Sequence, residues 1–364
     1  KYNSVAVQNA YHENPANSDI VQVAESLGAG KITGGNIEHS GGAFQILQSA
    51  KFYMYSGVIS NNKAVVYGGA FYVCQQTSVK IYDGIIANNS AGAGGGIYLR
   101  EDAKFNFYNG FMFNNRATTN SGGGIYCAYL TTPANIYAGV IAKNTALDDG
   151  GGILVGNSKL NMYGGILDRN IARGVPSSCG GGICGLTATI NISGAKITNN
   201  ECGYLGGGVY NQTSPGKVTI SDTFITGNKA TGEEGVVVGV THGGAIFCGS
   251  SDLSLGAGCL IYTNYAQSNL DNVCFSNPIE IYENLVGNGK AFRVALNPAS
   301  STILTSGLRA HKSSLTANQL FLADNNMTIN ENSAGEAIIG TTANTAQSIT
   351  WKWGTGANQN ALNY

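Results

Sequence analysis

Short runs of alternating apolar and polar residues recur along most of the chain, separated by turns rich in glycine and asparagine. Within one repeat this alternation predicts three strands, over residues 96–99, 104–108 and 111–114. In the first strand Ile97 and Leu99 point inward and Tyr98 points outward, and in the second Phe105 and Phe107 point inward. Strands this short cannot enclose a core within one repeat, so we expect the repeats to stack on one another.

Two motifs set the period of the repeat. An apolar residue follows a glycine-rich turn, in steps of 26 to 30 residues with a last step of 37, at Phe44, Phe71, Ile97, Ile125, Ile153, Ile183, Val209 and Ile246. An asparagine stands three residues after an apolar residue, in the same phase, at Asn62, Asn89, Asn115, Asn144, Asn170, Asn200 and Asn228. Two motifs that keep a common phase over this length indicate a repeat architecture.

The repeat predicts an all-β fold, a single-stranded right-handed parallel β-helix over residues 32–275 with about eight to nine rungs. Propeller blades need longer strands and leucine-rich repeats need a leucine ladder, and the repeat has neither. We expect the asparagines at corners, where they tolerate left-handed backbone and hydrogen-bond to their counterparts in the next rung. We expect the glycines where the chain passes close to the neighbouring rung.

The two ends of the chain lack the repeat. Residues 1–31 are predicted to form an N-terminal cap, with a strand over Lys1–Gln8 and a helix over Asp19–Leu27. Residues 276–364 are predicted to form a C-terminal last rung, over Asn277–Asn284, and a β-rich cap. The strands of that cap are expected at 292–296, 302–304, 319–322, 337–339 and 348–353.

The alternation of Gly-Gly-Ala-Phe or Gly-Gly-Ala-Ile with Ile-x-x-Asn resembles the repeats of the polymorphic outer-membrane proteins. It is also similar to the Gly-Gly-Gly-rich β-helix surface proteins of gut bacteria. The resemblance covers residues 32–275 and implies an exported, cell-surface, adhesin-like protein. Here Ile, Leu or Met replaces the family's Phe, and we expect neither a membrane barrel nor autotransport from this chain.

Charge and hydropathy narrow the range of partners. Charged residues make up only 11% of the chain and the net charge is −1, which gives no electrostatic reason to expect nucleic acid or an anionic membrane as partner. No apolar run is long enough to span a bilayer, so we expect no membrane insertion by this segment. The chain begins at Lys1, which is consistent with a mature exported segment, and we expect an extracellular or cell-surface location.

The eight cysteines show no paired C-x-x-C spacing, so a zinc site is not expected. Cys179 and Cys202 both stand between a corner asparagine and the next glycine-rich strand, and we interpret them as a candidate disulfide between neighbouring rungs. Cys127 and Cys248 alternate inward and are expected to be buried thiols.

Carboxylates dense enough for acid–base chemistry occur in only a few places, some of them in turns. The groups are Asp148 with Asp149, Asp168 with Arg169, and Glu233 and Glu234 with His242. We interpret them as solvated charges, because none shows the spaced pattern of a calcium loop and the histidines are scattered. The sequence therefore predicts no catalytic residue, no metal and no cofactor.

Tyrosine is repeated in phase with the motifs. One column stands four residues before the apolar residue of the asparagine motif, with its members pointing outward: Tyr55, Tyr82, Tyr108, Tyr137 and Tyr163, followed by Ser193 and Ser221. A second, shorter column consists of Tyr72, Tyr98 and Tyr126. Such columns either stiffen the sheet by stacking or form a platform for a sugar chain or a partner protein. Charged neighbours are few, so binding to such a platform is expected to depend weakly on salt.

Two classes of function remain open. The favoured one is a non-enzymatic surface protein, an adhesin, stalk or filament subunit that contacts a glycan or a protein of a host or neighbouring cell and self-associates end to end. The alternative is a carbohydrate-active β-helix, similar to a polysaccharide lyase or hydrolase. An enzyme should show a groove lined with acids, whereas an adhesin should show aromatic or polar stripes.

Overall fold

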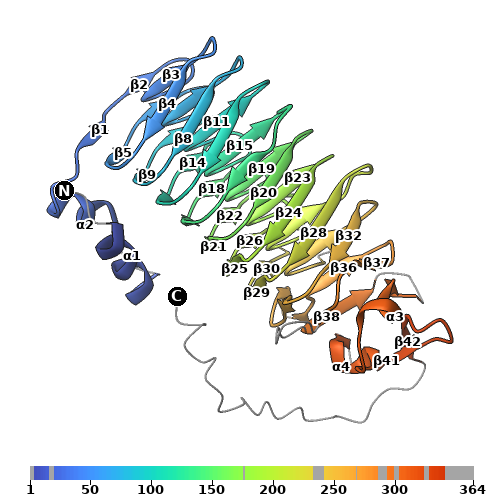
Figure 1. Ribbon diagram of the computed structural model, residues 1–364. Helices are drawn as coiled ribbons and strands as arrows, with labels where there is room; N and C mark the ends of the chain where they lie inside the picture. The colour runs from blue at the N-terminus through green and yellow to red at the C-terminus, as the bar shows by residue number, and fades with distance from the viewer. Residues whose placement is uncertain are drawn as a thin grey trace.

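The computed structural model describes residues 4–15, 20–174, 177–232, 242–267, 269–285, 293–298, 303–323 and 328–340. These residues form a parallel β-solenoid, which confirms the predicted β-helix (Figure 1). It has about 10 turns, more than the eight to nine rungs expected. Each regular turn contributes four strands, not the three that the alternation predicted, because a two-residue strand follows each asparagine. This fourth strand is too short to show a period of its own.

The strands stack in four columns, and a strand pairs in parallel with its counterpart in the next turn. The first column follows the glycines: β3 (Phe44–Ile46), β7 (Phe71–Val73), β11 (Ile97–Arg100), β15 (Ile125–Ala128), β19 (Ile153–Gly156), β23 (Ile183–Leu186), β27 (Val209–Asn211), β31 (Ile246–Cys248) and β36 (Val273–Phe275). The second column, here called the tyrosine sheet, comprises β4 (Lys51–Met54), β8 (Ser78–Ile81), β12 (Lys104–Phe107), β16 (Ala134–Ile136), β20 (Lys159–Met162), β24 (Thr189–Ser193), β28 (Lys217–Ser221), β32 (Asp252–Leu255), β37 (Ile279–Ile281) and β39 (Thr305–Ser306).

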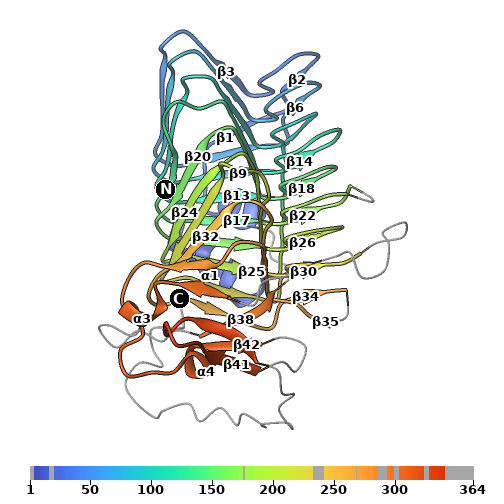
Figure 2. The ribbon, with the colours of Figure 1, turned by 90° about the vertical axis from the view of Figure 1, so that its right-hand side faces the viewer.

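The third column comprises β1 (Lys31–Thr33), β5 (Val58–Ser60), β9 (Ile85–Ala87), β13 (Phe111–Phe113), β17 (Val140–Ala142), β21 (Ile166–Asp168), β25 (Lys196–Thr198), β29 (Phe224–Thr226) and β33 (Leu260–Ile261). The fourth column runs along one edge of the solenoid in Figure 2 and comprises β2 (Asn36–Ile37), β6 (Lys63–Ala64), β10 (Ser90–Ala91), β14 (Arg116–Ala117), β18 (Thr145–Ala146), β22 (Ile171–Ala172), β26 (Glu201–Cys202), β30 (Lys229–Ala230), β34 (Tyr265–Ala266) and β35 (Asn269–Leu270). Only the last pair, β34 and β35, is antiparallel within this column.

The core consists of the inward residues of the first three columns, which stack on their counterparts in the next turn. Ile97, Phe107 and Met112 of one turn are each fully buried. The glycines allow the turns to approach: a Cβ on Gly123 would lie 2.3 Å from the carbonyl oxygen of Gly151 in the next turn. Gly122, just before it, has a φ of +71°, which a residue with a side chain adopts only with strain.

The corner asparagines form a continuous ladder inside the solenoid, here called the asparagine ladder. Each amide donates to the Oδ1 atom of the next asparagine at 2.8–3.0 Å. Its members are Asn62, Asn89, Asn115, Asn144, Asn170, Asn200, Asn228, Asn264 and Asn272. The expected hydrogen bonds are confirmed, but the expected left-handed backbone is found at the preceding residue, as at Asn88 and Asn114, with φ values of 56° and 51°. The ladder asparagine itself turns its amide inward.

The N-terminal segment contains two helices, α1 (Ser4–Glu13) and α2 (Ile20–Ser26). The predicted strand over Lys1–Gln8 is therefore wrong, whereas the predicted helix over Asp19–Leu27 agrees with α2. Val7 and Tyr11 lie one helical turn apart and pack on the outer side of the third column, in a cluster with Phe111 and Phe113. The helices thus cover the side of the solenoid, and Ile32 on the first turn remains exposed.

Parallel pairing continues past residue 275. β38 (Arg293–Pro298) pairs with β33 and β36, and β40 (Phe321–Ala323) pairs with β38. The short helices α3 (Leu308–His311) and α4 (Ala317–Leu320) and the antiparallel pair of β41 (Thr328–Glu331) and β42 (Ala337–Gly340) follow this core. The strand expected at 319–322 is divided between α4 and β40. The strand expected at 302–304 is wrong for its described residues, because Ile303 forms only an isolated bridge to Ile338 and β39 begins at Thr305. The strand expected at 348–353 lies outside the described residues.

The cysteines are buried free thiols. Cys127 and Cys248 point into the core as expected. Cys202 pairs in register with Ala172 and Ala230, whereas Cys179 pairs with Leu205. Cys179 stands directly before its glycine run and Cys202 stands two residues after its ladder asparagine, so the two cysteines occupy different register positions and the register that suggested a disulfide is not the one observed.

Candidate functional site

The five tyrosines of the first predicted column stack on the outer face of the tyrosine sheet. The ring centroids lie 4.9, 4.9, 4.8 and 5.2 Å apart from Tyr55 through Tyr82, Tyr108 and Tyr137 to Tyr163. The first three pairs are nearly parallel, at 5–6° between ring planes. We call this set the tyrosine ladder.

The stacking decides which part of each ring a partner can reach. Each face is turned toward the ring of the next turn, so the ladder presents ring edges and hydroxyl groups to solvent, once per turn. Desolvation, with Tyr108 and Tyr163 on either side, raises the pKa of Tyr137, which keeps its hydroxyl a neutral hydrogen-bond donor. The expected flat aromatic platform is therefore a row of hydroxyls, and open ring faces are left only at its two ends.

A row of amides runs beside the tyrosine ladder. Asn135 donates to Asn106 at 3.1 Å, Asn161 donates to Asn135 at 3.0 Å, and Asn191 donates to Asn161 at 2.9 Å. These residues stand two positions before the tyrosines or Ser193, so they project from the same face. We call them the outer asparagine row. Each is half-buried, which leaves one side of its amide toward solvent.

Lysines form a third row on this face that the sequence reasoning missed. Lys51, Lys104 and Lys159 occupy the same register position on alternate turns, with Ser78 and Pro133 between them. All three lysines are exposed. The signal was a Lys-x-x-x-Tyr spacing, which places both side chains on one face of a strand. The expectation of few charged neighbours is therefore wrong for this face.

The tyrosine ladder ends at a hollow of about 150 Å³, lined by residues that include Tyr163, Asn191, Ser193, Ser221 and Tyr282. Ser221 donates to the Ser193 hydroxyl at 3.2 Å, so two small polar side chains form the floor. Tyr163 is 53% exposed and turns an open ring face toward the hollow.

Tyr282 closes the opposite side of this hollow. A Cβ on Gly256 would lie 2.6 Å from the Tyr282 hydroxyl, so the ring of Tyr282 leans over that glycine toward Ser221. The hollow depends on two serines and a glycine at positions where tyrosines stand in earlier turns. A small hydroxylated ring is the kind of ligand that fits an aromatic wall above a hydroxyl floor.

In the second predicted column Tyr98 is buried, and Tyr72 and Tyr126 are half-buried. Tyr98 stacks on Tyr67 at 4.3 Å and on Tyr126 at 4.7 Å, and it is only 7% exposed. Burial raises the pKa of Tyr98. Tyr72 lies 5.9 Å from Tyr98 in the same cluster. Tyr98 offers a partner little contact, and Tyr72 and Tyr126 spend part of their surface on stacking with it, so we give this column less weight than the tyrosine ladder.

The acidic candidates do not gather at one place. Asp168 accepts hydrogen bonds from Tyr11 at 2.6 Å and from Thr198 at 2.7 Å and pairs with Arg169, so it fixes α1 to the third column. Asp149 accepts the backbone N–H of Cys179 at 2.7 Å, and burial raises its pKa to about 6.

The third acidic group lies partly outside the described residues. Glu233 and Glu234 fall in the gap between 232 and 242. His242 lies 3.1 Å from Asp271, and this hydrogen bond raises the pKa of the histidine. Among the described residues, no group of three or more His, Cys, Asp or Glu side chains is placed to hold a metal.

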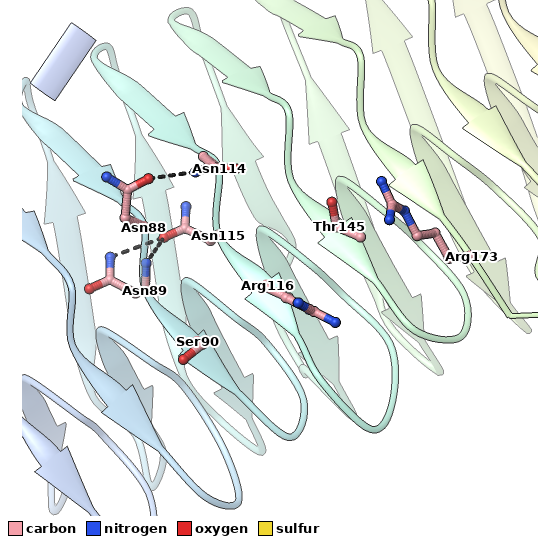
Figure 3. A pocket seen from close by; sticks show the side chains of 8 residues that line it. All are labelled: Asn88, Asn89, Ser90, Asn114, Asn115, Arg116, Thr145 and Arg173. Carbon is pink, nitrogen blue, oxygen red and sulfur yellow. Dashed lines mark hydrogen bonds between the residues drawn. The ribbon is translucent and has the colours of Figure 1, made fainter. Parts of the chain in front are cut away.

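A larger open hollow of about 490 Å³ lies on the other side of the solenoid, at the corner between the third and fourth columns (Figure 3). Its amides are engaged with one another: Asn114 donates to Asn88 at 2.6 Å, and Asn89 and Asn115 belong to the asparagine ladder. We therefore give more weight to the tyrosine sheet, where three rows repeat in register.

No family model, curated protein or solved structure matches the chain in the comparisons with known proteins. None of the helices that the structure describes is long and apolar enough to cross a membrane. The fold itself defines the chain as a parallel β-helix repeat protein.

Proposed function

We propose that this chain is a non-enzymatic, extracellular surface protein, adhesin-like, that binds an extended glycan along the tyrosine sheet. The observation that supports this most is the tyrosine ladder, which offers one hydroxyl per turn from Tyr55 to Tyr163. A linear polysaccharide advances by about one sugar ring over the distance between two turns, so one hydroxyl can meet each sugar, with one amide beside it in the turns of Tyr108, Tyr137 and Tyr163. A stalk or filament role and end-to-end association remain further proposals of the same kind.

The polar character of the face favours a glycan over a protein partner. Protein interfaces gain most from buried aromatic faces and apolar area, which the ladder hides between its own rings. A glycan, by contrast, needs many donors and acceptors in a regular row. The open face of Tyr163 adds one position where a sugar ring can stack.

The test is binding of a panel of polysaccharides to the wild type and to two triple variants at Tyr82, Tyr108 and Tyr137. Replacement by Phe retains the stacked rings and removes three hydroxyls, while replacement by Ser removes the rings as well. Each lost hydrogen bond contributes about 1 kcal/mol, so we expect the Phe variant to bind at least about tenfold more weakly. Tyr129→Ser is the control, because Tyr129 is exposed outside the ladder.

Circular dichroism must first show that the variants keep the β-helix. Equal binding by the wild type and both folded variants would overturn the proposal. Binding of a protein instead of any polysaccharide would move the assignment to a protein partner. Release of new reducing ends from a bound polysaccharide would support the alternative of a carbohydrate-active enzyme.

A further inference from the structure

We propose that the ligand is a linear acidic polysaccharide that carries a carboxylate or sulfate on every second sugar and lies along the solenoid axis over the tyrosine sheet. This inference rests on the proposed function and names the substrate class of the same face. It depends on the register of the lysines relative to the tyrosines and asparagines.

The lysines supply positive charge at a fixed spacing. Lys51, Lys104 and Lys159 stand on alternate turns, and turns of a β-helix lie about 4.8 Å apart, so their positions repeat at about 10 Å. Within the described part of the chain, none of the three has a carboxylate within salt-bridge distance. Lys80, in the neighbouring row, lies over the ring of Tyr53 at 5.9 Å and adds a further charge.

The two periods on this face match the two periods of an alternating polymer. Hydroxyls repeat once per turn from Tyr55 to Tyr163, and therefore about once per sugar, and amides repeat with the same period from Asn106 onward. The lysines of the main row repeat once per two turns, and therefore about once per disaccharide. A polymer with an acid on alternate sugars places each acid over a lysine while every sugar meets a tyrosine, joined by an asparagine in the turns of Tyr108, Tyr137 and Tyr163.

The positive stretch ends where the tyrosine ladder ends. From β4 to β24 the outward positions of the tyrosine sheet hold no carboxylate. From β28 onward the sign changes: Lys217 pairs with Glu280 at 2.9 Å, and Asp252 stands at the next position of the lysine row. Charge and hydroxyls thus mark the same segment of the solenoid.

Three carboxylates lie in the turns that flank this segment, and each has a partner: Glu101 pairs with Arg100 at 3.1 Å. Asp102 accepts the hydroxyl of Thr131 at 2.8 Å, and Asp83 accepts the N–H of Gly84 at 2.8 Å. They border the face and do not interrupt its rows.

The experiment measures binding of three polymers of matched length by isothermal titration calorimetry. The first is hyaluronan, in which a uronate alternates with a neutral sugar, the second is the same polymer with its carboxylates reduced to alcohols, and the third is a polyuronate with an acid on every sugar. We expect the wild type to bind hyaluronan at least about tenfold more tightly than the reduced polymer, with an affinity that falls as salt is raised.

The Lys104→Gln/Lys159→Gln variant should bind hyaluronan about three- to tenfold more weakly and show a smaller salt dependence. Lys63→Gln/Lys229→Gln is the matched control, because it removes the same charge from exposed positions of the fourth column. These exposed substitutions are expected to leave the fold intact.

Equal binding of acidic and reduced polymers, together with no effect of the Lys104 and Lys159 changes, would overturn the acidic ligand but leave the proposed function standing. Tighter binding per site of the fully charged polyuronate would overturn the alternating spacing. If the wild type binds no polysaccharide in this set or in the wider panel, the proposed function itself fails.

Discussion

Replacement of one rung of the asparagine ladder should destabilise the protein far more than the same replacement on the outer face. Asn144 is fully buried, and its Oδ1 accepts the N–H of Asn115 at 2.9 Å and the amide of Asn115 at 3.0 Å. Its own amide donates to Asn170 and to the carbonyl of Met112, both at 2.9 Å. Asn144→Ala removes all four hydrogen bonds.

The cost can be worked out from the groups that lose their partners. Two buried donors of Asn115, the backbone N–H and one amide hydrogen, are left without an acceptor. The cavity left by the Asn144 side chain lies inside the solenoid and offers them no replacement. Each unsatisfied buried group costs about 1–3 kcal/mol, so the variant should lose about 4 kcal/mol of unfolding free energy. Asn135→Ala is the matched control, because Asn135 belongs to the same turn and makes amide contacts of similar length, but on the half-exposed outer face. Water can replace those contacts, so its cost should stay below about 1 kcal/mol.

Equilibrium unfolding in urea, followed by circular dichroism and by tyrosine fluorescence, measures this difference. The two signals should give coincident transitions before free energies are compared, because long repeat arrays do not always unfold in one step. If the two variants differ by less than about 1 kcal/mol, buried amide pairing is not what stabilises the corners, and the reasoning is refuted.

Three further predictions concern a glycine between two turns, a buried carboxyl group and a buried thiol. Gly123→Ala brings a methyl group to 2.3 Å from a carbonyl oxygen and should cost about 3 kcal/mol or more, whereas Gly156→Ala, with its nearest contact at 3.7 Å, should show an unchanged thermal midpoint. Burial raises the pKa of Asp149 to about 6, so the folded state keeps a proton that the unfolded state releases near pH 4, and stability should fall as pH rises from about 4 to about 6. Asp149→Asn should abolish that fall in urea titrations, and an unchanged slope would contradict the assignment. Burial raises the pKa of the Cys127 thiol to about 12, so at pH 8 a thiol reagent should label it at least about a hundredfold more slowly in the folded protein than in urea, and similar rates would show that the core is open.

The class of fold and the content of its core followed from the sequence alone. Period-two alternation placed Ile97 and Phe107 inside and Tyr98 and Tyr108 outside, and the structure agrees on the direction of each. The asparagine motif predicted a hydrogen-bonded column because a residue repeated once per turn must meet its own counterpart in a parallel stack. These features depend on the spacing of residues within a repeat and on the period of the repeat, and both can be read directly from the sequence.

Features that depend on contacts across the repeat came only from the tertiary structure. The first residues form α1 because Val7 and Tyr11 pack on a distant strand, and Asp168 receives the Tyr11 hydroxyl across 157 positions of the chain.

The candidate site was also only partly visible in the sequence. The tyrosine ladder and the stacking of its rings were both among the expectations, but how closely parallel the rings lie depends on the spacing of folded strands. The Lys-x-x-x-Tyr spacing is present in the sequence. Only the strand register, however, shows that Lys104 and Lys159 occupy one position on alternate turns. The hollow beside Tyr163 exists because Tyr282 leans over Gly256, and such a shape results from side-chain packing in three dimensions rather than from any period along the chain.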